Sequence, residues 1–195
     1  MTPIRATVSV PEPDLKEIRR YARCPEGSDA LIAEVLAEMA SLTYRVCFVE
    51  AEIRKSGEAL DLGFAVTDSK DLAKALAGCD RLLLFAATVG RLPDTLVARY
   101  NRLSPAKALF VQAVGAERVE ALCDAFCKEK AAEYARGGES LRPRYSPGYG
   151  DLPLSLQKNI FDVLDCPRTI GLTLTETLLM VPTKSVTAIA GITRK

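Results

Sequence analysis

The feature that most constrains the fold of this chain is the apolar run LLLFAA over residues 82–87, which leaves no face of a strand for water. Such a run predicts a strand that is buried on both sides. It is far shorter than the roughly 20 residues that a membrane span requires. Because 48% of the 195 residues are hydrophobic, the chain can enclose this strand in a sizeable core. We expect one soluble domain over residues 1–195.

Helical and extended patterns alternate on both sides of this run. Apolar residues recur at helical spacing in several segments. We predict helices over 14–23, 28–42, 93–103, 105–135 and 154–164, a short helix capped by Ser69, and extended segments over 43–51, 60–64, 169–175 and 185–192. We expect a hairpin across 55–58, and Gly115 is expected to kink or divide the long helix. Helices before, between and after strands favour an α+β fold.

Composition excludes several classes of function. Lys and Arg number 26 and Asp and Glu 25, so a net charge of +1 offers no overall field to attract nucleic acid or an anionic membrane. The first residues lack the apolar stretch of a targeting signal, and the six cysteines are scattered. We therefore expect a cytoplasmic protein with reduced thiols. Cys123 and Cys127, four residues apart, could share a metal but are better explained as small buried hydrophobes.

The chain contains no histidine. This removes the Ser/His/Asp triad, the zinc patterns that use histidine and the usual proton shuttle at neutral pH. No G-x-x-x-x-G-K-[ST] loop is present, and no G-x-G-x-x-G follows a strand. We therefore expect no catalytic side chain and no metal site of its own.

The loop over residues 142–153 is the densest in chemistry. It combines Arg142 and Arg144 with Tyr145, Tyr149 and glycines that allow a ligand close to the backbone. This composition suits a small amphipathic ligand that carries a carboxylate. The alternative is a surface connector whose arginines are solvated. Nucleic-acid binding by a single basic and aromatic loop is disfavoured, because it offers few phosphate contacts.

Two motifs connect this loop with the end of the chain. Arg144, Gly148 and Tyr149 form R-x-x-x-G-Y, and residues 174–186 form L-T-E-x-x-x-M-x-P-x-x-S-V. Together, over residues 144–188, they resemble the activation module of cobalamin-dependent methionine synthase. The resemblance implies a curved, largely antiparallel sheet flanked by helices. One departure lies within the first motif, where the family continues G-Y-P-A-C-P and this chain reads GYGDLP.

The resemblance also implies binding residues. The family's R-x-x-x-G-Y segment binds S-adenosylmethionine, which assigns cofactor contacts to Arg144, Pro147, Gly148 and Tyr149, with Tyr149 beside the corrin. Arg144 can form a forked pair with the methionyl carboxylate, and Tyr149 offers an aromatic face to the sulfonium. Glu176 is either a further ligand contact or a structural partner of backbone and arginine groups.

The function implied by the resemblance is that of a stand-alone activation component, inactive without a partner. It would present S-adenosylmethionine for reductive methylation of cob(II)alamin held by a cobalamin-binding methionine synthase or another corrinoid protein. A low-potential donor such as flavodoxin or ferredoxin would supply the electron. Two alternatives remain open: a binding or scaffold protein that has lost S-adenosylmethionine, and a reactivator of a different corrinoid methyltransferase.

Overall fold

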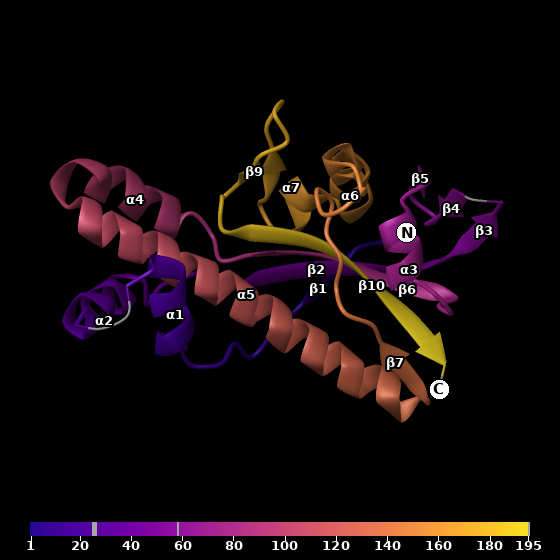
Figure 1. Cartoon of the computed structure of the whole chain (residues 1–195), viewed down its shortest axis with the longest axis horizontal. Coiled ribbons are helices and arrows are strands. Elements are labelled where there is room, and N and C mark those ends of the chain that lie inside the picture. The colour runs from indigo at the N-terminus through magenta and orange to yellow at the C-terminus, as the bar shows by residue number, and fades with distance from the viewer. Residues whose placement is uncertain (25–26, 58, 195) are drawn as a thin grey trace.

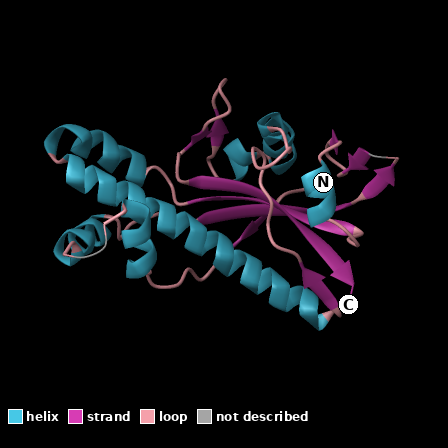
Figure 2. Cartoon of the chain, viewed as in Figure 1, coloured by secondary structure: helices cyan, strands magenta, loops and turns pink. Residues whose placement is uncertain are grey.

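The computed structural model describes residues 1–24, 27–57 and 59–194, and its centre is a five-stranded sheet. The strand order is β1 (Ile4–Ala6), β2 (Arg45–Glu52), β6 (Arg81–Thr88), β10 (Ser185–Arg194) and β7 (Glu139–Leu141). Every neighbouring pair is antiparallel. With its flanking helices the sheet gives the α+β fold that the sequence predicts (Figure 2).

Strand β6 lies in the middle of this sheet, as its apolar sequence predicts. Phe85 is opposite Phe48 of β2 on one side and Ala188 of β10 on the other. Leu82 and Leu84 pack into one core cluster, whereas Leu83 and Phe85 pack into another. The side chains of β6 therefore contribute to the core on both faces of the sheet.

Helices cover both faces (Figure 1). Their bounds are α1 (Leu15–Ala22), α2 (Asp29–Glu38), α3 (Lys70–Ala75), α4 (Leu92–Leu103), α5 (Pro105–Arg136), α6 (Gln157–Leu164) after a 3₁₀ turn (Leu154–Leu156), and α7 (Cys166–Thr169). Helix α5 packs on the face that carries Phe85, with α1, α2 and α4 around its first half. Helices α3, α6 and α7 pack on the opposite face.

Two smaller sheets lie outside the central one. Strands β3 (Arg54–Ser56), β4 (Ala59–Asp61) and β5 (Val66–Thr67) form the first, and β8 (Thr173–Leu174) and β9 (Met180–Val181) form the second. The pairing of β3 with β4 confirms the hairpin expected across 55–58, of which Glu58 itself is outside the described residues.

Several local predictions were wrong. The extended segment predicted over 60–64 ends at Asp61 in β4, because the chain turns at Gly63, whose φ is +78°. Helix α5 continues through Gly115 without a break, and a Cβ at that position would lie 3.0 Å from Cγ of Lys184, so the glycine makes room for this side chain. The helix predicted to reach residue 42 ends at Glu38. The segment over 169–175 is not one extended run, because α7 ends at Thr169 and β8 has only two residues.

The six cysteines are free. Cys123 is buried in the core as predicted, whereas Cys127 is only partly buried against the same cluster. Within the described ranges, no group of three or more His, Cys, Asp or Glu could hold a metal ion. Over the same residues, no helix has both the length and the apolar character needed to cross a bilayer.

Candidate functional site

The loop that follows β7 runs along the outer edge of β10. The N–H of Tyr145 donates to the carbonyl of Ile189 at 2.7 Å, and the N–H of Ile189 donates back at 2.8 Å. The N–H of Arg142 donates to the carbonyl of Gly191 at 2.8 Å. These bonds extend the sheet by one short segment and fix the position of the R-x-x-x-G-Y motif beside β10.

Asp151 anchors the other end of the loop to α3. Its carboxylate accepts hydrogen bonds from the Ser69 hydroxyl and from the N–H groups of Lys70, at 2.7 Å, and Asp71, at 3.2 Å. The hydrogen bond from Ser69, with those backbone groups, lowers the pKa of Asp151. Asp151 belongs to the GYGDLP segment, in which this chain departs from the family pattern. Its negative charge complements the partial positive charge at the start of α3.

A cavity of about 630 Å³ lies between this loop, β10, α5 and α6. Arg144, Pro147 and Tyr149 line it, so the structure brings three of the five predicted binding residues together. Gly148, between them in the chain, forms a turn in which its N–H donates to the carbonyl of Leu152 at 2.9 Å.

Arg144 reaches from the loop to α5. Its Nη2 lies 2.6 Å from Oε2 of Glu120 and 2.8 Å from Oδ1 of Asp124. Burial works to lower the pKa of Arg144, but the hydrogen bond to Glu120 and the nearby charges outweigh it and raise that pKa above its ordinary value. The guanidinium is therefore held in place by carboxylates with which a ligand carboxylate must compete.

Tyr149 lies at the open side of the cavity. Its backbone is fixed because the hydroxyl of Tyr145 donates to its carbonyl at 3.1 Å. The residue is 69% exposed. The ring is therefore free to stack on a ligand in the cavity or to contact a molecule that docks over it.

Glu176 lies apart from the other four predicted residues. It is exposed in the turn between β8 and β9, and it is not among the described residues that line the cavity. Other residues of its motif are closer: Met180 lines the cavity, and Oγ of Ser185 lies 2.8 Å from the carbonyl of Pro182 and 2.8 Å from Oγ1 of Thr88. The second motif mainly fixes the start of β10.

Several polar residues of the cavity were not predicted from the sequence, among them Gln157, Lys184 and Thr187. Gln157 and Thr187 are 5% and 2% exposed, and within the described residues Oε1 of Gln157 and Oγ1 of Thr187 have no hydrogen-bond partner. Burial lowers the pKa of Lys184, against the opposing charge of Asp94. No local pattern distinguishes Gln157 from an ordinary first residue of a helix.

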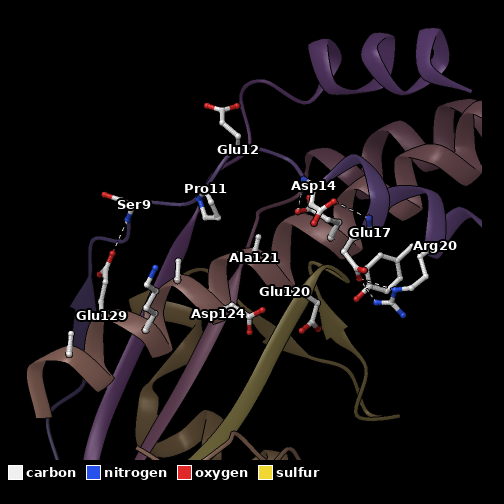
Figure 3. A pocket seen from close by; sticks show the side chains of 15 residues that line it. Ser9, Pro11, Glu12, Asp14, Glu17, Arg20, Glu120, Ala121, Asp124 and Glu129 are labelled. Atoms are coloured by element: carbon white, nitrogen blue, oxygen red, sulfur yellow. Dashed lines mark hydrogen bonds and ion pairs between the residues drawn. The ribbon is translucent and has the colours of Figure 1, made fainter. Parts of the chain in front are cut away.

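A second cavity, of about 870 Å³, adjoins the first and shares Tyr21 and Glu120 with it. Figure 3 shows Glu120 and Asp124 on α5 directed toward it, with Asp14 and Glu17 on the other side. Its acidic residues outnumber its two cations, Arg20 and Lys128. A ligand with a free carboxylate is therefore better accommodated in the cavity beside β10.

A solved structure has a fold similar to that of this chain. The chain resembles a crystal structure of the MetH reactivation domain bound to AdoHcy, with a TM-score of 0.63 and 17% identity. The match covers 84% of this chain and 65% of that chain. At this identity the likeness shows a common fold, and this chain spans about 65% of the length of that structure.

A family comparison is more specific. Residues 70–193, more than half of the chain, match the family model of the vitamin B12 dependent methionine synthase activation domain. The chain belongs to this family, which confirms the resemblance of its two motifs. No curated protein matches the sequence.

Proposed function

We propose that this chain binds S-adenosylmethionine in the cavity beside β10 and presents its methyl group to a cobalamin held by a partner corrinoid protein. The observation that carries the proposal is the meeting of Arg144, Pro147 and Tyr149 in one cavity of about 630 Å³ in a member of the activation-domain family. The reactivation domain of similar fold was crystallised with AdoHcy, the demethylated form of the same ligand.

The charged side of the cavity matches the amino-acid part of this ligand. Arg144 pairs with the carboxylate, and the Glu120 carboxylate beside it neutralises the ammonium group. The exposed ring of Tyr149 covers the sulfonium, which an aromatic face attracts. The fit requires neither an acid nor a base, in keeping with a chain that has no histidine.

The chemistry belongs to the cobalamin: a low-potential donor of the flavodoxin or ferredoxin type adds one electron to the cob(II) form, the methyl group passes from sulfur to cobalt, and S-adenosylhomocysteine leaves. These residues contribute proximity and orientation. The chain contains no histidine that could supply an imidazole ligand to cobalt, which supports the proposal that the partner holds the cobalamin. The chain thus acts as a methyltransferase component that needs its partner.

The test is spectroscopic. The cobalamin-binding part of a B12-dependent methionine synthase, loaded with cob(II)alamin, is mixed with a low-potential reductant and S-adenosylmethionine. Adding this chain should speed the appearance of the methylcobalamin spectrum. Omitting S-adenosylmethionine is the control. Equal rates with and without the chain, for this and for other corrinoid proteins, would exclude the reactivation role.

A second candidate is a binding protein of the same fold that no longer takes S-adenosylmethionine. The pairing of Arg144 with both Glu120 and Asp124 favours it, because this arginine is neutralised without a ligand. Isothermal titration with S-adenosylmethionine separates the two, since the second candidate predicts no heat of binding.

A further inference from the structure

Two residues that line the cavity beside β10, Gln157 and Thr187, each carry a buried polar atom. Among the described residues, Oε1 of Gln157 and Oγ1 of Thr187 are buried without a hydrogen-bond partner, and both residues line the cavity beside β10. Buried polar groups in native proteins are nearly always paired, so unpaired ones require an explanation. Their occurrence in the same cavity, on two different elements, indicates a place for a polar ligand group.

The backbone of β10 is also open at this point. The outward N–H of Ile189 pairs with Tyr145, and the outward carbonyls of Ile189 and Gly191 pair with the same loop. In an antiparallel strand every second residue directs its N–H and C=O to the same side, so those of Thr187 point outward as well. Within the described residues, neither the loop nor β7 pairs with Thr187. Thr187 thus offers a hydroxyl, a backbone donor and a backbone acceptor.

The cavity therefore has two chemically different sides. Arg144 is bound to α5, which covers one face of the sheet. Thr187 shares its side of β10 with Ile189, which packs into the opposite cluster together with residues of α6, and Gln157 is the first residue of α6. One side is charged, and the other is neutral with unpaired hydrogen-bonding atoms.

We infer that Gln157 and Thr187 form the subsite that recognises the base of the ligand, by hydrogen bonds to the polar edge of adenine. This inference rests on the proposed function. Gln157 accepts a hydrogen bond from the exocyclic amine, and Thr187 pairs with a ring nitrogen. Adenine suits the pair because its exocyclic N–H donor lies next to a ring nitrogen that accepts a hydrogen bond. Adenine is also uncharged, so a buried neutral subsite can bind it without the cost of burying a charge.

The experiment compares three ligands by isothermal titration: S-adenosylhomocysteine, S-inosylhomocysteine, which replaces the amine by a carbonyl, and 5′-methylthioadenosine, which lacks the amino acid. The wild-type chain should prefer the adenine form to the hypoxanthine form by about tenfold or more, the range of one buried hydrogen bond. Gln157→Leu should abolish this preference, and Gln157→Glu, which retains an acceptor, should keep it.

Thr187→Val tests the second residue, with Thr187→Ser as its matched control. The valine variant should bind both S-adenosylhomocysteine and methylthioadenosine about tenfold more weakly. Arg144→Ala should weaken only the former, because methylthioadenosine has no carboxylate. The serine variant should retain wild-type affinity. Removal of an unpaired polar atom should leave the melting temperature of Gln157→Leu and Thr187→Val at or above that of the wild type.

The titrations distinguish a failure of the proposed function from a failure of the base subsite alone. If the wild-type chain binds none of the three ligands, the proposed function is wrong and the base subsite fails with it. If it binds S-adenosylhomocysteine while folded Gln157→Leu and Thr187→Val keep both its affinity and its preference for adenine, the function stands and the subsite is overturned. If Gln157→Leu does not fold, Thr187→Val alone decides whether the subsite is overturned, by the same criterion.

Discussion

At the scale of single residues, the loop at the site depends on a small side chain at position 150. Gly150 has a φ of +52°, and a Cβ there would collide with the carboxylate of Asp71 and lie 2.5 Å from the hydroxyl of Tyr145. That hydroxyl in turn holds the carbonyl of Tyr149. The glycine therefore allows the loop to approach α3 and keeps Tyr149 at the cavity.

Gly150→Ala should strain the backbone and displace either Asp71 or Tyr145. We expect a loss of about 1 to 3 kcal/mol in the free energy of unfolding, measured in urea, and weaker ligand binding. Gly138→Ala is the matched control for backbone strain, because its φ is also positive, at +76°, but a Cβ there meets nothing within 4 Å. Equal losses of ligand affinity in both variants would show that the close contacts at Gly150 do not keep Tyr149 at the cavity.

At the scale of elements, α5 and α3 organise the site from opposite faces of the sheet. Helix α5 has 32 residues and supplies Glu120 and Asp124, which hold Arg144. Helix α3 has six residues, and its start is capped by Ser69 and by Asp151. Because the loop carries Asp151, the stability of α3 and the position of the cavity wall are linked.

Asp151→Asn should lower the melting temperature near neutral pH, since it removes the charge at the start of α3. The folded pKa of Asp151 lies below its ordinary value, chiefly because of the hydrogen bond from Ser69. The carboxylate therefore stabilises the fold fully above the unfolded pKa, about 3.9, and this contribution is lost as the pH falls through the folded pKa. The difference in melting temperature between wild type and variant should shrink below about pH 4.

The exposed Asp162 of α6 provides the control, because Asp162→Asn changes the same charge without removing a helix cap. Its melting temperature should follow that of the wild type across the same pH range. A difference for Asp151→Asn that persists unchanged at low pH would show that its carboxylate does not act through its charge.

Local patterns predicted the elements better than the contacts between them. The apolar run of β6, the Ser69 cap and the long helix α5 were predictable because each depends on neighbouring residues. The first motif grouped Arg144 with Tyr149, and the two residues line the same cavity. The contact of Asp151 with Ser69, the pairing of Arg144 with α5 and the unpaired Thr187 depend on residues far apart in the chain, for which the sequence contains no local signal.

At the scale of the whole molecule, a buried ion pair within α5 forms hydrogen bonds to the first part of the chain. Arg118 and Glu117 are each 5% exposed, and Nε of Arg118 lies 2.6 Å from Oε2 of Glu117. Arg118 also donates to the carbonyl of Pro11 at 2.6 Å, and the N–H of Asp14 donates to Glu117 at 3.2 Å. These bonds fix the segment before α1, which precedes the residues matched by the family model.

Arg118→Met should lower the free energy of unfolding by about 3 to 5 kcal/mol, because it leaves the Glu117 carboxylate buried without its partner. The double variant Glu117→Leu with Arg118→Met should recover part of this loss, since it removes both charges. Urea denaturation measures both. A single variant as stable as the wild type would show that the pair does not hold the two parts together.

We propose that the cavity beside β10 binds S-adenosylmethionine through Arg144. Titration of wild type, Arg144→Ala, Arg144→Lys and Arg142→Ala with this ligand is the direct test. Loss of a charge-assisted hydrogen bond should weaken binding by roughly ten- to hundredfold in Arg144→Ala, with Arg144→Lys intermediate. Arg142 is exposed, so Arg142→Ala should bind like the wild type. No heat with the wild-type chain, or unchanged affinity in a folded Arg144→Ala, would contradict the claim.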